Sequence, residues 1–493
     1  MLDSIEESPL YPIANPKSIA FFGASNRITS MGTNLLASIQ ALGFEGAIYP
    51  VHPHEKHVRN LKAYRSVSDL PEVTDLAVLV LPTRIVPQTM EECGKKGIKR
   101  AIIVSGGFKE VGGKGVDLEQ QIREIADRYG IRFLGPNCIG VANPHHKLNT
   151  TFLPYEGAPG YIGMASQSGS LVTQMFNYLS RYGLSFSTAF SLGNEANIDI
   201  VDCLDYLAAC PHTRVIALYI EAIKRGSAFV DKARAIVPHK PIVALYVGGS
   251  ETGKRASFSH TGAMAGPDLL YEGIFRQSGI IKAQSVTELF DFCWALGSLP
   301  IPKGRRVVIQ THSGGPGAAA ADACGRAGLE LPPLTDETLD KLDSLLPHTS
   351  SRNNPVDLTF TKDPLQYFAD IPKVLLEDKN VDILLVYFLT VGKVIRRALE
   401  QMGIPREQIA EQSRKLLDEQ CESVATLMKN SDKLFLGYTY RSVEDPFIRG
   451  LLQRRVTVFP EATRAARALQ ALLWYSDLRN KLLDGSARGT EEI

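Results

Sequence analysis

An excess of charge of either sign is the first thing this sequence lacks. Its 493 residues contain 54 Lys and Arg against 53 Asp and Glu, so no overall charge favours nucleic acid or an anionic membrane. It has no run of about 18 apolar residues, which argues against a transmembrane helix. The first residues are acidic and contain no apolar secretory segment. We therefore expect a cytoplasmic protein with no nucleic-acid or membrane partner.

Paired cysteines are also missing. The seven cysteines are scattered and none lies in a CxxC pair, which argues against zinc and is typical of reduced cytoplasmic thiols. The stretch HPHEKH contains three histidines (from His52 to His57), but no second set of ligands converges on it. We interpret it as a solvated loop, and His145 and His146 as linker residues. We expect no metal site.

Short apolar strands alternate with helical patterns along the whole chain. The first part reads SIAFF, AIYPV, LAVLVL, AIIV and RFL, with helical stretches such as VPQTMEECGKKG between them. The alternation continues after NPHHKLNTTFLPYEGAPG and again after GSLPIPKGRR. Such spacing predicts βαβ units and parallel sheets. We predict an α/β protein of three doubly wound parallel modules at residues 1–143, 144–298 and 299–493.

The loop after the first strand consists of the small residues Gly23, Ala24, Ser25 and Asn26. Small residues let backbone N–H groups approach a phosphate, and the next helix presents its positive N-terminus. The loop is not GxGxxG, and the second strand has no acid at its end, which argues against NAD. A tight turn without a ligand is the alternative interpretation.

A second loop of this kind lies in the middle of the chain. Ser166, Gln167, Ser168 and Gly169 separate a strand from a helix. Hydroxyl groups and free N–H groups at a helix start favour an anion. Simple capping of the helix by serine is the alternative.

One histidine stands in a segment of small residues, SETGKRASFSHTGAMAG. This residue, His260, has an imidazole that titrates near neutrality and can act as a nucleophile. Glu221 directly follows the apolar run VIALYI and is suited to accept a hydrogen bond from the other ring nitrogen of His260. A structural histidine is the alternative.

Several motifs together give the chain a family resemblance. SHTGAMAG is similar to the SHTGALAG of the α part of ADP-forming acetate–CoA ligases, which are relatives of succinyl-CoA synthetase. GPNCIG (from Gly135), SLGNEANIDIVD (from Ser191), GGPG (from Gly314) and NPVD (from Asn354) also match. Asn197 stands where the family pattern has Asp, which affects local loop details.

The resemblance implies a fold and an activity. It implies a Rossmann-like CoA-binding module followed by two flavodoxin-like CoA-ligase modules. Acyl-CoA and phosphate would give acyl phosphate and CoA, and the phosphoryl group would pass to His260 and then to ADP. Glu221 would be the partner of that histidine. The phosphate site would comprise Ser166, Gln167, Ser168 and Gly169. The CoA site would comprise Gly23, Ala24, Ser25, Asn26, Lys56, Pro82, Ser105, Gly106 and Asn137.

The resemblance also implies a partner. Only a polar tail follows Trp474, and the family's ATP-grasp module is not recognisable. We expect an ATP-grasp β subunit in trans that carries ADP or ATP with Mg²⁺, in a hetero-oligomer or with an α-subunit dimer. The remaining ligands would be CoA, phosphate and a small carboxylic acid of unspecified identity. A non-catalytic acyl-CoA sensor is the main alternative, and a nicotinamide-linked oxidoreductase is a weaker one.

Overall fold

The computed structural model describes all residues except 1, 3, 255–265, 359–366, 390–391 and 484–493. The chain divides into two compact units. One comprises residues 1–180 and 184–289, and the other comprises residues 181–183 and 290–493. Among the described residues, no helix has both the length and the apolar character needed to cross a membrane.

The first sheet is built entirely from parallel strands. Its order is β2-β1-β5-β6-β7, so the direction of winding reverses between β1 and β5. Ligands of such sheets bind outside the carboxyl ends of the strands at this reversal. The strands are β1 (Ser18–Phe22), β2 (Ala47–Val51), β5 (Leu76–Leu79), β6 (Arg100–Ile103) and β7 (Arg132–Leu134). The helices are α1 (Tyr11–Ala14), α2 (Met31–Ala41), α3 (Val86–Lys96) and α4 (Lys114–Tyr129), and the small hairpin is β3 (His57–Val58) with β4 (Leu61–Lys62).

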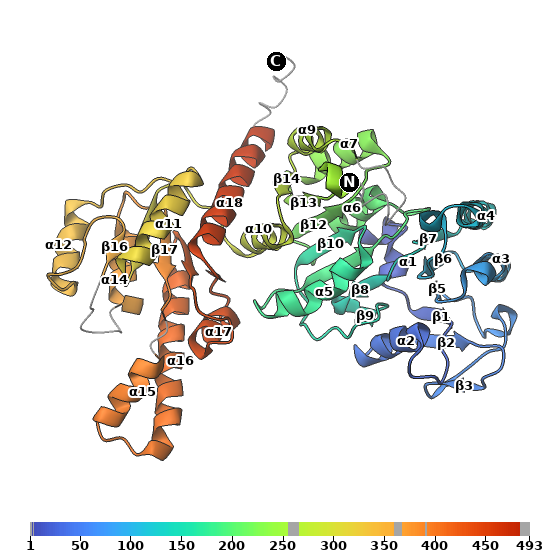
Figure 1. Cartoon of the computed structure of the whole chain (residues 1–493), viewed down its shortest axis with the longest axis horizontal. Helices are drawn as coiled ribbons and strands as arrows, with labels where there is room; N and C mark the ends of the chain where they lie inside the picture. The colour runs from blue at the N-terminus through green and yellow to red at the C-terminus, as the bar shows by residue number, and fades with distance from the viewer. Residues whose placement is uncertain (1, 3, 255–265, 359–366, 390–391, 484–493) are drawn as a thin grey trace, which may run out of the picture. The chain divides into compact units, whose positions relative to one another are not determined.

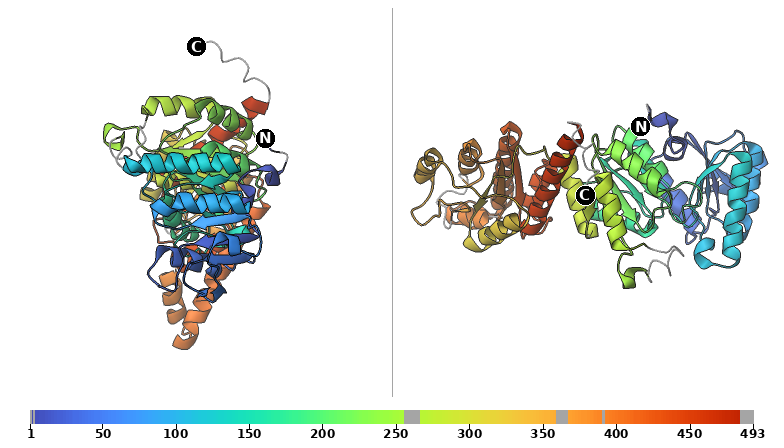
Figure 2. Two further views of the ribbon diagram at one scale, coloured as in Figure 1. Left: turned by 90° about the vertical axis from the view of Figure 1, so that its right-hand side faces the viewer. Right: turned by 90° about the horizontal axis from the view of Figure 1, so that it is seen from above.

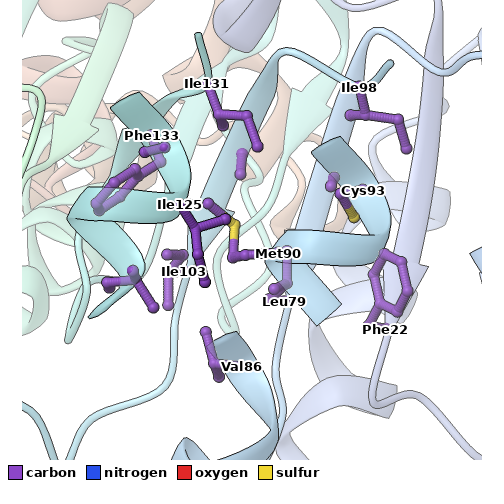
Figure 3. Close-up of a cluster of buried hydrophobic side chains, with 14 of the residues drawn as sticks. Phe22, Leu79, Val86, Met90, Cys93, Ile98, Ile103, Ile125, Ile131 and Phe133 are labelled. Carbon is purple, nitrogen blue, oxygen red and sulfur yellow. The ribbon is translucent and has the colours of Figure 1, made fainter. Parts of the chain in front are cut away.

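Apolar spacing along α3 and α4 fixes these two helices to the first sheet. Met90 of α3 and Ile125 of α4 pack in one buried cluster with Leu79 and Ile103 from neighbouring strands, as Figure 3 shows. Burying side chains of this size contributes about 1.5–3 kcal/mol each. The strands of the first sheet are therefore held in place by the close-packed helices α3 and α4.

The second sheet has the order β14-β13-β12-β10-β11-β8-β9. Its five parallel strands reverse direction of winding between β10 and β12, and two short antiparallel strands extend one edge. The strands are β8 (Val141–Asn143), β9 (Leu148–Asn149), β10 (Ile162–Ser166), β11 (Phe186–Ser191), β12 (Val215–Ile220), β13 (Ile242–Tyr246) and β14 (Ile281–Ala283). The helices are α5 (Gly169–Ser180), α6 (Ile200–Ala209), α7 (Gly226–Ile236), α9 (Asp268–Ser278) and α10 (Val286–Ser298). Figure 1 shows these strands within the first unit.

The third sheet lies in the second unit and repeats the same winding. Its parallel strands have the order β16-β15-β17-β18-β19. The strands are β15 (Val307–Thr311), β16 (Val356–Asp357), β17 (Ile383–Tyr387), β18 (Leu434–Tyr438) and β19 (Val458–Phe459). The helices are α11 (Gly314–Arg326), α12 (Asp336–Leu345), α14 (Asp370–Glu377), α15 (Gly392–Gln401), α16 (Arg406–Asn430), α17 (Pro446–Gln453) and α18 (Ala462–Leu483).

The charged stretch at residues 399–428 forms most of a helical hairpin. α15 packs against α16, and Figure 1 and the left view of Figure 2 show the pair extending from the rest of its unit. The predicted α/β class with parallel sheets is confirmed. Residues 141–149 are an addition to it, because they form β8 and β9 at the edge of the second sheet.

Candidate functional site

The loop after β1 lies at the winding reversal of the first sheet. Gly23 has a φ of +92°, and a Cβ atom there would lie 1.9 Å from the carbonyl oxygen of Val80. Only glycine fits this backbone position. The loop after β1 therefore runs directly against the end of the neighbouring strand β5, where the sheet topology places a ligand crevice.

Hydrogen bonds fix the rest of this loop. The hydroxyl of Thr33 accepts from the N–H of Ser25 and donates to its carbonyl (3.1 and 2.8 Å). The side-chain amide of Asn26 donates to the carbonyl of His57 (2.9 Å). Lys56 is exposed in the segment that follows β2. The loop is thus ordered before a ligand arrives, which lowers the entropy lost on binding.

The other predicted CoA residues lie at the carboxyl ends of β5, β6 and β7. The Ser105 hydroxyl donates to the carbonyl of Leu81 and accepts from its N–H. The Asn137 N–H donates to the carbonyl of Ser105 (2.9 Å). Asn137 has a left-handed φ of +58°, and its amide oxygen lies 3.2 Å from where a Cβ of Gly106 would be. Pro82 is exposed beside them. We call these residues, with residues 23–26, the CoA loops.

Residues 166–169, the phosphate loop, form a tight turn between β10 and α5. The Ser166 hydroxyl donates to the Ser168 carbonyl (2.7 Å) and accepts from the Ser168 N–H (3.1 Å). A Cβ on Gly169 would lie 3.2 Å from both Ile139 and the Ser191 hydroxyl. Ser166 therefore shapes the turn, while the Ser168 hydroxyl and the first N–H groups of α5 are the donors suited to an anion.

Gln167 connects the phosphate loop to Glu221. Its side-chain oxygen accepts from the backbone N–H groups of Glu221 and Ala222. Its side-chain nitrogen donates to the Ala222 carbonyl (2.6 Å). Glu221 is only 7% exposed and directly follows β12. The two predicted elements therefore meet at the winding reversal of the second sheet.

His260 lies outside the described residues, but the residues on either side of its segment are defined. The Tyr246 hydroxyl donates to the Gly266 carbonyl (2.7 Å), and the Tyr246 ring stacks on Tyr271 with 3.6 Å between centroids. The Tyr271 hydroxyl accepts from the N–H of Ile223 (3.2 Å). A Cβ on Gly249 would lie 2.7 Å from Asp268. Gly266, after the segment, is thus anchored beside β13, and Gly249, before the segment, lies close to Asp268 after it.

The other histidine motif has a structural role. The His52 ring nitrogen Nδ1 accepts the N–H groups of His54 and Glu55 (3.2 and 2.9 Å), which stabilises the turn. His145 stacks on His212, and His146 is hydrogen-bonded to the carbonyl of Pro16. Within the ranges that the structure describes, no group of three or more His, Cys, Asp or Glu residues could hold a metal ion.

Sequence reasoning assigned no role to a polar cluster in the loop between β11 and α6. Glu195 is 6% exposed, and burial raises its pKa to about 7 despite the nearby Lys224 ammonium. Burial also lowers the pKa of Lys224. Burial acts to raise the pKa of Asp199, but the hydrogen bonds and charge of Arg225, together with the N–H groups of Val201 and Asp202, outweigh it and lower that pKa. Perturbed groups of this kind gather at functional sites; the SLGNEANIDIVD match was the available signal.

Two family models match the N-terminal part of the chain. Residues 17–144 match a CoA binding domain, and residues 159–296 match a succinyl-CoA ligase like flavodoxin domain. The matches cover the modules that contain the CoA loops and the phosphate loop.

Longer matches come from individual proteins. Subunit alpha of ADP-forming acetate–CoA ligase II from Pyrococcus furiosus is 40% identical over 371 residues, which are 75% of this chain and 80% of that one. An ADP-forming 4-hydroxybutyrate–CoA ligase from Nitrosopumilus maritimus is 34% identical over 94% of this chain, which spans 64% of that relative.

A solved structure is similar over nearly the whole chain. It is the dinucleotide-forming acetyl-coenzyme A synthetase 1 of Ca. Korarchaeum cryptofilum, in complex with phosphate and ADP. The TM-score is 0.84 with 32% identity, and the match covers 97% of this chain and 98% of that one.

Proposed function

The chain belongs to the family of ADP-forming acetate–CoA ligases, and we propose that it performs the CoA, phosphate and phosphohistidine steps of such an enzyme. The overall reaction is the reversible conversion of acyl-CoA, ADP and phosphate to a carboxylic acid, ATP and CoA. The observation that carries the proposal is the meeting of the phosphate loop with Glu221 at the winding reversal of the second sheet.

The first step joins phosphate to the acyl group. The CoA loops would hold acyl-CoA, and the Ser168 hydroxyl with the N-terminus of α5 would hold phosphate. A phosphate oxygen attacks the thioester carbonyl carbon, a C–O bond forms and the C–S bond breaks. The departing sulfur takes a proton and leaves as CoA, and acyl phosphate remains. The preorganised donors of the loop stabilise charge that develops on phosphate.

The second step moves the phosphoryl group to His260. A ring nitrogen forms the P–N bond, the P–O bond to the acyl group breaks, and the carboxylate leaves. Glu221 would accept a hydrogen bond from the other ring nitrogen and stabilise the charge on the ring. The anchoring of Gly266 through Tyr246, and of Ile223 through Tyr271, supports this pairing, since both contacts lie near Glu221.

Transfer from His260 to ADP completes the cycle. We propose that an ATP-grasp β subunit binds the nucleotide, with Mg²⁺, and that the working enzyme is a hetero-oligomer. The description of the Pyrococcus relative as a subunit alpha supports the partner, and the ADP in the Korarchaeum structure supports the nucleotide. The substrate is a carboxylic acid, since relatives are described as ligases of acetate and of 4-hydroxybutyrate and as a trans-feruloyl-CoA synthase.

Labelling tests the proposal directly. The chain is incubated with acyl-CoA and radioactive phosphate, and the label is expected on His260 in an acid-labile, base-stable form. His260→Ala should lose the label and keep CoA binding, because the CoA loops lie in another module. Label retained in His260→Ala would refute the assignment. CoA binding without any label in the wild type would instead favour an acyl-CoA sensor.

A further inference from the structure

A chain of hydrogen bonds joins the CoA loops to the phosphate loop through residues 192–199, which we call the bridging loop. The bridging loop connects β11 to α6. Its backbone is fixed to the segment after β7, since Asn194 N–H donates to the Pro136 carbonyl (2.9 Å) and Ala196 N–H to the Gly135 carbonyl (3.0 Å). A Cβ on Gly193 would lie 2.3 Å from the Pro136 carbonyl oxygen. No side chain can therefore enter between the two segments.

On the CoA side, Asn194 makes the connection. Its side-chain nitrogen donates to Glu110 (2.6 Å) and to Glu119 (2.9 Å). Its side-chain oxygen accepts from the side-chain amide of Asn137 (3.4 Å). Asn137 belongs to the CoA loops, so Asn194 orients a predicted CoA residue from the second module. Glu110 also accepts the N–H of Gly107, in the segment after β6.

On the phosphate side, the N–H of Leu192 in the bridging loop donates to the carbonyl of Ser166 (2.9 Å). One carboxylate oxygen of Glu195 accepts from the N–H of Ile200 (3.0 Å), and the nearby Gln167 side chain limits the rise in the pKa of Glu195 that burial causes. Gln167 in turn holds the backbone at Glu221. Lys224 donates to the carbonyls of Asn194 and Glu195 (2.7 and 2.8 Å) and lies 3.9 Å from the Glu195 carboxylate.

The backbone of Glu195 supports a functional interpretation. Its φ of +51° is left-handed, which is unfavourable for a residue with a Cβ and is typical of sites where geometry is constrained by function. A buried acid also requires partners to offset the loss of hydration. The fold retains both features at the point where two predicted subsites are joined.

We propose that Glu195 is a positioning residue that, with Asn194 and Lys224, holds the CoA loops and the phosphate loop at a fixed separation. The proposal rests on the proposed function, because a fixed separation matters when a phosphate oxygen must reach the thioester carbon. Displacement of reacting groups by about 1 Å can lower a rate about 100-fold. Glu195 does not itself contact the reacting atoms in this scheme.

Amide hydrogen exchange tests the connection without turnover. CoA alone is added to the wild type and to Glu195→Ala. In the wild type we expect slower exchange both at residues 135–140 and at residues 166–169. In Glu195→Ala the first effect should persist, while slowing at residues 166–169 falls from about tenfold to under about twofold. Equal slowing in both proteins, or none at residues 166–169 in the wild type, would overturn the proposal.

The rate of phosphorylation from acyl-CoA and phosphate provides the second readout. Glu195→Ala should lower the rate at saturating substrate about 100-fold and leave KM for acyl-CoA within about twofold. Glu195→Gln keeps the size and a hydrogen-bonding group, so it should stay within about fivefold of the wild type. A folded Glu195→Gln protein as slow as Glu195→Ala would overturn the positioning role, since charge would then be the requirement.

Two further variants keep the result interpretable. If Glu195→Ala does not fold, Lys224→Met removes the ammonium from a half-exposed side chain, and it should reproduce both effects. Asp291→Asn is the matched control, because Asp291 is also a buried acid, paired with Arg464 in the other unit. It should match the wild type in both readouts. A wild type that binds CoA without being phosphorylated would refute the proposed function, while the exchange result would still decide on Glu195.

Discussion

The second and third sheets contain the same turn at the same place in the same winding. In the second, Ser166 bonds to the N–H and carbonyl of Ser168. In the third, the Thr311 hydroxyl bonds to the N–H and carbonyl of Ser313 (3.2 and 2.9 Å). A helix follows each turn at a glycine, Gly169 or Gly314. Topology and local chemistry thus supply two similar helix starts.

The residue in the middle of each turn makes the difference. In the second sheet, the Gln167 side chain accepts a hydrogen bond from the backbone N–H of Glu221, so the Glu221 carboxylate is held beside the phosphate loop. The equivalent residue in the third turn, His312, stacks on Tyr367 with 3.5 Å between centroids. The strand equivalent to β12 is β17, which ends at Tyr387. The comparison teaches that the winding is the same in both sheets, while one polar side chain and one acid distinguish the turn for which we propose phosphoryl chemistry.

The largest effect on the phosphorylation rate should come from Glu221, the acid beside the phosphate loop. Glu221→Gln should slow phosphorylation of His260 about 100- to 1000-fold, since one preorganised electrostatic partner is removed. The single-turnover rate with labelled phosphate measures this. Asp357→Asn, beside the start of α11, is the matched change in the third sheet and should leave the rate within about twofold. A comparable loss in Asp357→Asn would break the comparison.

Exchanging the middle residue should have the next largest effect. Gln167→His introduces the residue of the third turn and removes the acceptor for the N–H groups of Glu221 and Ala222. We expect phosphorylation about 10- to 100-fold slower, with CoA affinity unchanged, because Glu221 is no longer held in place. Stopped-quench kinetics and calorimetry with CoA distinguish the two quantities. An unchanged rate would show that Gln167 is only a capping residue.

Stability should depend on pH through Glu195 in the second module. Its pKa is about 7 in the folded chain against an ordinary 4.5, so the folded state keeps a proton that the unfolded state loses. Stability therefore falls as pH rises between these values. Glu195→Gln cannot ionise, and its free energy of unfolding relative to the wild type should rise by roughly 1–3 kcal/mol between pH 5 and pH 8. Urea unfolding measures both proteins, and a free-energy difference between them that is the same at pH 5 and pH 8 would contradict this.

The smallest effect should come from His312 and should have the opposite sign. Burial lowers its pKa from 6.5 to about 4, so the unfolded state takes up a proton that the folded state refuses. Stability is therefore lost as pH falls below 6.5. His312→Gln should gain roughly 1 kcal/mol relative to the wild type between pH 8 and pH 5. Urea unfolding at both pH values measures it, and an unchanged difference would show that the ring is solvated.

Much of the fold follows from local pattern. The strands SIAFF, AIYPV and VIALYI occupy β1, β2 and β12 as predicted, because a buried parallel strand is a short apolar run. β8 lies at the end of the predicted first module and β9 in the stretch interpreted as a linker, yet both belong to the second sheet, since strands of two or three residues have no readable period. The helix expected after the loop at residues 23–26 begins at Met31, where the Ser30 hydroxyl caps it.

The candidate site could be predicted only in part. The phosphate loop and Glu221 were recognisable because each directly follows a strand of readable pattern. The contacts of Asn194 were not, because Glu110 and Glu119 lie 84 and 75 positions away in the sequence. Pairings of that kind depend on how two modules pack, which no local period encodes. Asn197, the departure from the family pattern, accepts the N–H of Phe133 (3.2 Å) and thus still anchors the loop.

The anchored Gly266 sets a limit on the catalytic cycle proposed above. His260 lies six positions before Gly266, and an extended chain spans at most about 3.6 Å per residue, or roughly 20 Å in all. In that mechanism, every group that gives a phosphoryl to this histidine, or takes one from it, would have to come within about that distance of the Tyr246 contact, plus the length of the histidine side chain. A nucleotide held by the proposed partner subunit would have to be delivered into the same range, so the length of this chain segment would set the docking distance.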